Sequence, residues 1–180
     1  FGRYLGIERG GLEQLGLAGL LHDVGKIRID PAVLNKPGKL TEQEFALMKA
    51  HPGLGHRLLI GHRDLPPIVI DVVYGHHERP DGSGYPRKLG AEQIAPFTRI
   101  ISIVDTFDAI TSNRVYDSAR SVKDAFKVLM EMRNRQFDSE LVVHFIEWLG
   151  IFPVGTLVQL HTGEIGLVVE KNPQFKLRPK

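Results

Sequence analysis

Apolar residues recur at every third or fourth position through most of the first 150 residues, which is the spacing of helices that bury one face. The pattern predicts successive helices over 12–21, 42–48, from 51 onward, 68–77, 97–110, 122–132 and 139–149. The segment 97–110 is apolar on nearly every side, so we expect it to lie deep in the core. The predicted fold class is therefore mostly α.

Residues that commonly begin helices precede several of these segments. Thr41 and Glu44 have the spacing of a capping box, in which each side chain satisfies a free amide of the other. Pro66-Pro67 suits a first helical turn, where no amide proton is needed. Ser121 is placed to cap one helix, and either Asp138 or Ser139 to cap the last.

The pattern changes at the end of the chain. Alternating β-branched residues predict strands over 156–160 and 164–170, a hairpin turn at 161–163, and a third short strand over 175–177. The expected packing face consists of Val158, Leu160, Ile165, Leu167 and Val169. We therefore predict a helical domain at 1–150 and a small β-meander at 151–180, which needs a partner surface for stability.

Composition excludes several classes of function. The chain has 180 residues, no cysteine, and 23 basic against 21 acidic side chains, for a formal net charge of +2. Disulfides, thiolate metal sites and a cysteine nucleophile are excluded, and the charge balance provides no wide field for a nucleic-acid polymer or an acidic membrane. The longest apolar runs have about five residues, against about 20 for a membrane helix. With no visible signal peptide, we expect a cytoplasmic location, and the absence of an initial Met indicates a piece of a longer protein.

Histidine is the unusual component of this composition, because six of the eight histidines fall between His22 and His77. We interpret the isolated ones, His56, His62, His144 and His161, as structural or surface residues. The set left for chemistry is His22, Asp23, His51, His76, His77 and Asp105. Asp105 lies in the most apolar predicted helix, where a charge is costly unless it is paired or bound to a cation.

Imidazole and carboxylate together suit first-row metals such as iron, manganese and zinc. A pair of ions about 3.5–4 Å apart suits phosphoryl displacement. The set therefore predicts a metal site, and the alternative is that each histidine is a hydrogen-bonded core residue.

Five ordered motifs resemble the HD-GYP family, a branch of the HD phosphohydrolases. They are HDVGK at 22–26, KPGKLTEQE at 36–44, KAHPGLG at 49–55, HHERPDGSGYP at 76–86 and IVDTFDAITSNRVY at 103–116. The resemblance covers roughly residues 5–147. It implies an all-helical core with two or three divalent metal ions, most often iron or manganese. It also implies hydrolysis of the bacterial second messenger cyclic di-GMP to pGpG, and onward to GMP, by a metal-bridging hydroxide.

The same resemblance implies roles for single residues. The implied metal ligands are His22, Asp23, His51, His76, His77 and Asp105, with Asp23 bridging two ions. Lys26 would contact the scissile phosphate and act on the leaving oxygen, which makes Lys26 and Asp23 the expected catalytic residues. Tyr85, Asp108 and Arg114 are the further expected substrate contacts. The loop Gly84-Tyr85-Pro86 would also contact diguanylate cyclase domains of the GGDEF type.

Residues 79–96 are predicted to form a loop, because prolines and glycines recur through them, and single residues suggest its shape. We expect Gly82 and Gly84 to adopt positive φ, and Asp81 to cap nearby amides. Tyr85 either stacks on a base or pins the loop to the helical core. Lys36 is interpreted as a surface lysine rather than a ligand contact.

Two departures from the family pattern bear on activity. Members usually have a further ligand histidine on an upstream helix, of which Phe1–Ile7 resembles the tail. Asp117 stands where many members have a basic residue, so a phosphate contact is lost.

The leading prediction is a metal-dependent cyclic di-GMP phosphodiesterase that serves as the output domain of a longer signalling protein. One alternative is an inactive module that senses cyclic di-GMP or docks a GGDEF-type partner. Another is hydrolysis of a different cyclic dinucleotide or of a nucleotide monophosphate.

Overall fold

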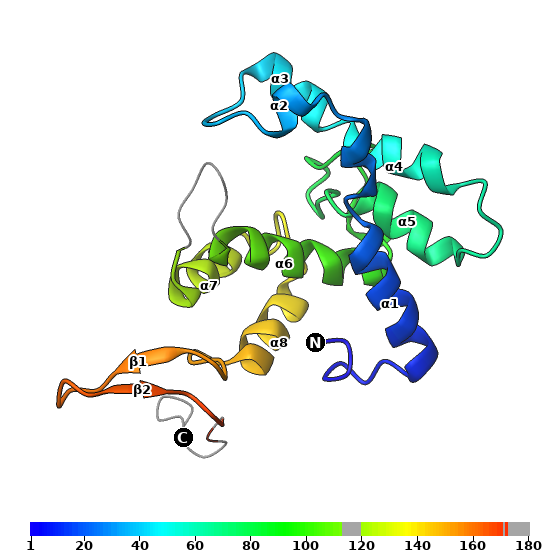
Figure 1. Cartoon of the computed structure of the whole chain (residues 1–180). Coiled ribbons are helices and arrows are strands. Elements are labelled where there is room, and N and C mark those ends of the chain that lie inside the picture. Colours follow the sequence, from blue (N-terminus) through cyan, green and yellow to red (C-terminus); the bar gives the residue numbers. More distant parts are fainter. Residues whose placement is uncertain (113–119, 171, 173–180) are drawn as a thin grey trace.

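The structure, a computed structural model, describes residues 1–112, 120–170 and 172, and consists there of helices followed by one β-hairpin (Figure 1). The α-helices are α1 (Arg9–Leu21), α2 (Pro31–Leu34), α3 (Glu42–Met48), α4 (His51–Leu59), α5 (Pro67–Gly75), α6 (Pro96–Thr111), α7 (Val122–Glu131) and α8 (Ser139–Leu149). The shorter elements are the 3-10 helices η1 (Val24–Arg28) and η2 (Ala91–Gln93) and the strands β1 (Leu157–Gln159) and β2 (Ile165–Leu167). In these described ranges, no helix has the length and apolar character needed to cross a membrane.

Helix α6 is central and contributes to two apolar clusters. Ile100 and Ile101 pack with residues of α1 and α5, and Ile103 packs with residues of α7 and α8. Figure 1 shows α6 between these two pairs of helices. The first cluster consists of Leu15, Ala18, Val69, Val72, Ile100 and Ile101, and the second of Ile103, Phe126, Leu129, Phe137, Val142 and Phe145. A helix covered on two sides must be apolar on two sides, which confirms the prediction for 97–110.

The predicted helix caps are confirmed, although α1 begins at Arg9, before the predicted residue 12, and α2 was not predicted. Both bonds of the Thr41–Glu44 capping box are present, at 3.3 Å from the Glu44 amide to Thr41 Oγ1 and 2.7 Å from the Thr41 amide to Glu44 Oε2. The Ser121 hydroxyl accepts from an amide in the first turn of α7. Of the two residues considered for α8, Asp138 is the cap, because Oδ1 accepts from the amides of Glu140 and Leu141.

Two expectations about the connections need correction. The segment Phe1–Ile7 forms turns instead of the tail of a regular helix, although the Leu5 amide still donates to the Phe1 carbonyl. The ring of Phe1 packs against Phe145 and Trp148, and this contact fixes the segment on α8. The predicted loop 79–96 contains η2 and a β-bridge between Asp81 and Gly90, so it folds back on itself.

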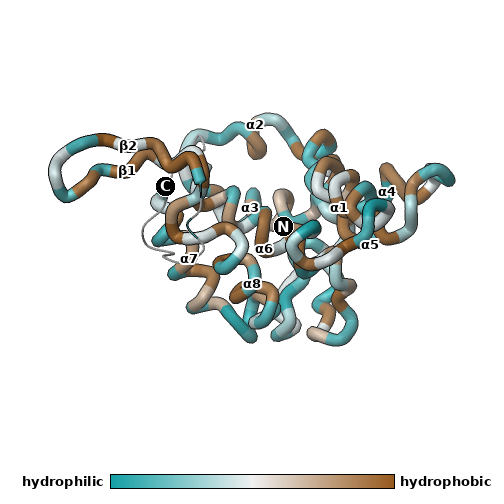
Figure 2. Tube along the Cα trace, turned by 90° about the horizontal axis from the view of Figure 1, so that it is seen from below, coloured by the Kyte–Doolittle hydropathy of each residue, from teal (hydrophilic) through white to brown (hydrophobic). Residues whose placement is uncertain are grey.

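The hairpin at the end of the chain projects away from the helices (Figure 2). Its turn lies where predicted, since the Leu160 amide donates to the Glu164 carbonyl and Gly163 has φ +93°. The strands are shorter than predicted, and the third predicted strand, 175–177, lies outside the described residues.

The predicted packing face of the hairpin is wrong. Pairing of Val158 with Gly166 puts Val158 and Leu160 on one face, and pairing of Leu157 with Leu167 puts Ile165, Leu167 and Val169 on the other. Most of these side chains are exposed, and Val168 is buried instead. A one-residue error in register moves every side chain to the opposite face, which is why alternation alone did not identify the buried residue.

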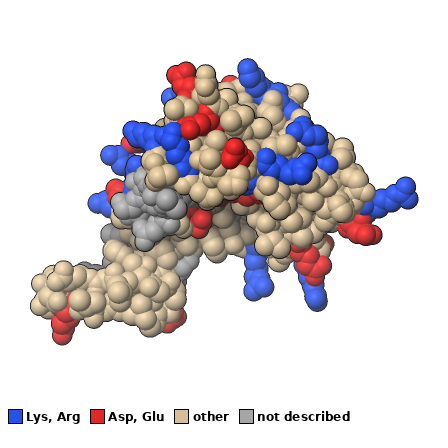
Figure 3. All heavy atoms as spheres, turned by 45° about the horizontal axis from the view of Figure 1, so that its top comes forward, with Lys and Arg blue, Asp and Glu red and all other residues tan. Residues whose placement is uncertain are grey.

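Charged side chains of both signs are interspersed over the helical part of the face in Figure 3. No broad region of one sign is seen on that face outside the grey atoms, in agreement with the net charge of +2. The fold therefore provides local charges at a site instead of a field over a surface.

Candidate metal centre

Helix ends bring the predicted ligands together. His22 is the residue that ends α1, Asp23 precedes η1, His51 begins α4, and His76 ends α5. Asp105 projects from the middle of α6. Gly25 is required for this convergence, because a Cβ there would overlap the carbonyl of His51, so only glycine lets η1 lie against α4.

The ligand atoms lie within a few ångströms of one another. Nε2 of His51 lies 3.2 Å from Asp23 Oδ1 and 3.1 Å from Nε2 of His76. Nε2 of His22 lies 3.3 Å from Asp23 Oδ2 and 3.6 Å from Asp105 Oδ1. Two overlapping groups of three could hold a metal ion in the described part of the chain: His51 with His76 and His77, and His22 with Asp23 and His76.

Three of the imidazole rings are oriented in the same way. The Nδ1 atoms of His22, His51 and His76 lie 2.7, 2.8 and 3.0 Å from the carbonyl oxygens of the residues three positions earlier in the chain. A carbonyl can only accept, so each Nδ1 carries the proton and each Nε2 of a neutral ring presents a lone pair. Fixing one ring nitrogen on the backbone in this way is how proteins orient histidine ligands.

This orientation tests whether the residues fit a metal. Lone pairs of His51 and His76 that point at each other, and at a carboxylate oxygen, repel unless a cation lies between them. Nε2 of His22 is buried and has no hydrogen-bond partner among the described residues. Imidazole nitrogens and carboxylate oxygens are suitable ligands for a divalent first-row metal. The residues therefore fit the predicted group.

The protonation states of the histidines and of Asp23 also suit them to bind a metal ion. Burial lowers the pKa of His22, but the carboxylates of Asp105 and Asp23 outweigh burial and raise it to about 10. Burial, with a further contribution from the charge on His22, lowers the pKa of His76 to about 4, and burial lowers that of His77 to about 3, so both rings are neutral at pH 7. Burial raises the pKa of Asp23, yet the side chains of His22, His51 and Lys26 close to its carboxylate prevail and hold that pKa below its usual range. A proton on His22 thus supplies the positive charge that a cation would supply.

Lys26, which the sequence predicts to act on the substrate, lies beside this cluster. Its Nζ lies 2.5 Å from Asp23 Oδ2, and its side chain is 31% exposed. The ammonium group is therefore accessible to an anion that approaches the cluster.

The loop after His77 covers one side of the cluster. The ring of Tyr85 stacks on the ring of His77, with centroids 4.8 Å apart and planes at 27°. Gly82 has the expected positive φ of +76°, and Asp81 Oδ1 accepts from the amide and hydroxyl of Ser83. The expectation for Gly84 is wrong in its reason. Its φ is not positive, and glycine is needed because a Cβ would overlap the backbone of residues 78–79.

Glu78 is a site residue that the sequence analysis missed. Its side chain is 0% exposed, and its two carboxylate oxygens accept from the amides of Arg87 and Leu89 at 2.6 and 2.9 Å. The available signal was its position directly after two candidate ligands and before a loop rich in glycine. A buried carboxylate requires several donors, and loop amides provide them.

The other candidate residues lie apart from the cluster. Asp108 is exposed and accepts from the hydroxyl of Ser112, and the structure does not bring it into either ligand group. Lys36 is partly exposed, and both oxygens of Glu44 accept from its Nζ, at 2.8 and 2.6 Å. Arg114 and Asp117 lie outside the described residues.

The isolated histidines show surface contacts. His56 stacks on Tyr74 with ring centroids 4.4 Å apart. His144 lies 3.9 Å from Glu147 Oε2, and His62 and His161 are exposed.

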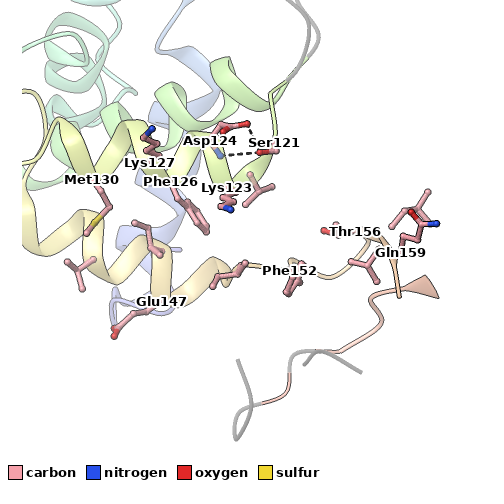
Figure 4. Close-up of a pocket in the computed structure, with 16 residues that line it drawn as sticks. Ser121, Lys123, Asp124, Phe126, Lys127, Met130, Glu147, Phe152, Thr156 and Gln159 are labelled. Carbon is pink, nitrogen blue, oxygen red and sulfur yellow. Dashed lines mark hydrogen bonds between the residues drawn. The ribbon is translucent and has the colours of Figure 1, made fainter. Parts of the chain in front are cut away.

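A wide apolar groove lies elsewhere, between α7, α8 and β1 (Figure 4). Its volume is about 1040 Å³, and its lining includes Phe126, Met130 and Phe152. None of the candidate ligands lines it. The ligand cluster, and not this groove, brings histidines and carboxylates together, so the cluster is the candidate site.

Comparisons with known proteins agree on the type of fold. The HD-domain family profile matches residues 1–141. The chain is 43% identical over 169 residues to the cyclic di-GMP phosphodiesterase PA4108 of Pseudomonas aeruginosa, covering 94% of this chain and 41% of that protein. It is 35% identical over 138 residues to the 3'3'-cGAMP-specific phosphodiesterase 3 of Vibrio cholerae, covering 76% and 29%. The structure resembles that of the HDG"Y"P protein Bd1817 of Bdellovibrio bacteriovorus, with TM-score 0.68 and 22% identity over 82% of this chain and 47% of that one. The chain thus spans less than half the length of these proteins.

Proposed function

The chain belongs to the HD-domain family, and on that premise we propose that it is a metal-dependent phosphodiesterase that hydrolyses cyclic di-GMP to pGpG and onward to GMP. The observation that carries the proposal is the convergence of three backbone-oriented imidazole rings on the carboxylates of Asp23 and Asp105. The substrate is proposed from the resemblance of the motifs and from the relative that is named for it.

The proposed ligands are His22, Asp23, His51, His76, His77 and Asp105. Asp23 is the proposed bridge, since Oδ1 faces His51 and His76 and Oδ2 faces His22. Two or three ions of iron or manganese are proposed. When bound, they would provide a water nucleophile at neutral pH and positive charge for the phosphoryl transition state.

Lys26 is the proposed contact to the scissile phosphate. Its ammonium lies beside Asp23 on the accessible side of the cluster, so a phosphodiester that reaches Asp23 also reaches Lys26. In hydrolysis the water oxygen forms the new bond to phosphorus, the bond from phosphorus to the ribose oxygen breaks, and a proton must reach that oxygen. The three protons of Lys26 suit it to donate there or to stabilise the leaving oxygen.

The loop is proposed to contact the nucleotide. Burial raises the pKa of Tyr85, so its phenol stays protonated and can donate a hydrogen bond to phosphate. Arg114 and Asp108 are proposed as further substrate contacts. Gly84-Tyr85-Pro86 is the proposed contact for a GGDEF-type partner, in a cytoplasmic signalling protein with an upstream domain.

A second substrate is supported by one finding. The relative from Vibrio cholerae is named as specific for 3'3'-cGAMP, which differs from cyclic di-GMP in one purine. The phosphodiester chemistry at the cluster is the same for both, so the cluster does not discriminate between them.

The test is product formation by the chain purified without air and loaded with iron or manganese. Cyclic di-GMP and 3'3'-cGAMP are supplied separately and together, and products are separated by chromatography. Asp23→Ala is the inactive variant, because it removes both oxygens that face the rings. Asp64→Ala, an exposed aspartate outside the cluster, is the matched control.

Linear product from the native chain and from Asp64→Ala, with none from Asp23→Ala, supports the proposal. The preferred substrate is the dinucleotide that is consumed faster in the mixture. Binding of cyclic di-GMP without product, in a chain that also holds metal, would replace the proposal with the sensor alternative.

A further inference from the structure

The loop that follows the candidate ligands is tied to the rest of the fold by polar contacts. Ile94, near the end of the loop, is buried, but no apolar side chain of residues 79–93 is fully buried, so polar contacts hold that part of the loop. Glu78 provides one tie, through its bonds from the amides of Arg87 and Leu89. These bonds connect the residue next to His77 with loop residues 9 and 11 positions later in the chain.

The Arg87 side chain provides a second tie, to α5. Its Nη2 lies 3.0 Å from Asp71 Oδ1, and its guanidinium lies 4.7 Å from the centroid of the Tyr74 ring. A Cβ on Gly75 would lie 2.8 Å from Nη2, so glycine at this position leaves the room that Arg87 occupies. Its Nε is also 3.9 Å from Glu78 Oε1, which brings the two ties together.

Tyr85 lies in the segment between Glu78 and Arg87, and these contacts hold both ends of that segment. Its amide donates to the carbonyl of His77 at 3.2 Å, and its ring stacks on the His77 ring. Gly84 lies against the backbone of residues 78–79 with no space for a side chain. The position of the Tyr85 ring, and with it the orientation of His77, therefore depends on the segment that Glu78 and Arg87 hold.

We propose that Glu78 and Arg87 form a positioning clamp that holds Tyr85 against His77 and so sets the orientation of one candidate metal ligand. This inference rests on the proposed function, because it assigns His77 to the metal site. Neither clamp residue contacts the reacting atoms. They act through Tyr85, as outer partners of a ligand do when they fix its ring.

The test compares clamp variants with conservative ones. Glu78→Gln keeps the shape but places an amide donor against one of two backbone amides, so that Arg87 or Leu89 loses its acceptor. Arg87→Leu removes the ties to Asp71 and Tyr74 from a side chain that is 29% exposed. Tyr85→Ala removes the stacked ring, and Tyr85→Phe retains it. Arg9→Leu, at a side chain 92% exposed on α1, is the matched control.

Three measurements are made on the folded chain. Amide hydrogen exchange reports the hold on residues 85–89, histidine side-chain NMR reports the ring of His77, and competition with a chelator gives the affinity for Mn²⁺. Glu78→Gln, Arg87→Leu and Tyr85→Ala should shift the His77 ring resonances and weaken Mn²⁺ binding about tenfold to a hundredfold. Amide hydrogen exchange at residues 85–89 should be faster in Glu78→Gln and Arg87→Leu than in the native chain. Tyr85→Phe and Arg9→Leu should bind Mn²⁺ with the affinity of the native chain.

The outcomes separate this inference from the proposed function. A native chain that binds no Mn²⁺ overturns the proposed function and the clamp with it. A native chain that binds Mn²⁺, with clamp variants of unchanged affinity, overturns the clamp alone, whether or not their exchange is faster. If Glu78→Gln does not fold by circular dichroism, Arg87→Leu carries the same test.

Discussion

Binding of a divalent metal at His22 should release one proton near neutral pH. The carboxylates of Asp105 and Asp23 outweigh burial and raise the pKa of His22 to about 10, so the metal-free ring is protonated at pH 7. A histidine ligand must be deprotonated, and the proton therefore leaves when the ion binds. Because the raised pKa lies above the working pH, the affinity should rise with pH until about pH 10.

The size of the effect follows from that one proton. Each unit of pH below about 10 changes the association constant about tenfold, or about 1.4 kcal/mol. Between pH 7.0 and 8.5 the dissociation constant for Mn²⁺ should therefore fall about thirtyfold. Asp105→Asn removes a carboxylate 3.6 Å from Nε2 of His22, lowers the pKa of the ring and flattens the dependence.

The assay is titration calorimetry under argon in two buffers with different ionisation enthalpies. The difference between the apparent enthalpies gives the number of protons released. Asp64→Asn, which changes an exposed carboxylate away from the cluster, should release the same number as the native chain. A dissociation constant that does not vary between pH 7.0 and 8.5, together with no proton release, would refute the reasoning.

Three further substitutions test separate parts of the structure. Lys26→Met removes the ammonium beside Asp23 and should lower kcat for cyclic di-GMP about a hundredfold or more, with Mn²⁺ affinity retained, so a parallel loss of metal would contradict the assigned role. Gly25→Ala forces a Cβ into the carbonyl of His51 and should cost about 1–3 kcal/mol in urea unfolding, whereas unchanged stability would disprove the close approach. Asp138→Ala removes the cap of α8 and should cost about 1 kcal/mol in the same measurement, and weakened Mn²⁺ binding by this variant would show that the cap also acts on the cluster.

The convergence of the candidate ligands could be expected from the sequence, but the orientation of their rings could not. His22, Asp23 and His76 stand in short motifs at the ends of apolar segments, and such positions are visible in a sequence. Ring orientation depends on the backbone path, because each Nδ1 contacts the carbonyl of the residue three positions earlier. Glu78 was missed for a similar reason, since the amides it binds belong to Arg87 and Leu89, and their return to the start of the loop is a tertiary feature.

For the hairpin, the sequence predicted the local structure but not the buried face. Alternation predicted its strands and its turn, but did not indicate which face would be covered. Val168 lies on the same face as Val158, because the turn pairs Leu160 with Glu164 and hence Leu157 with Leu167, and the predicted packing face did not follow that register. Helix starts were predicted well by comparison, because a cap such as Thr41 binds an amide only three residues away.

The distribution of buried polar groups explains why the candidate cluster is visible in the sequence. The described chain fully buries five polar or charged residues: His51, His76, Glu78, Thr98 and Ser102. Four of them belong to the cluster or support it, since Ser102 donates its hydroxyl to the carbonyl of His76 and Glu78 holds the loop beyond His77. Burying a polar group is costly unless its partners are in place, so a fold keeps such groups where their chemistry requires them. A sequence that otherwise follows the rule of apolar interiors departs from it around the candidate cluster, and the motifs contain three of these departures, His51, His76 and Glu78.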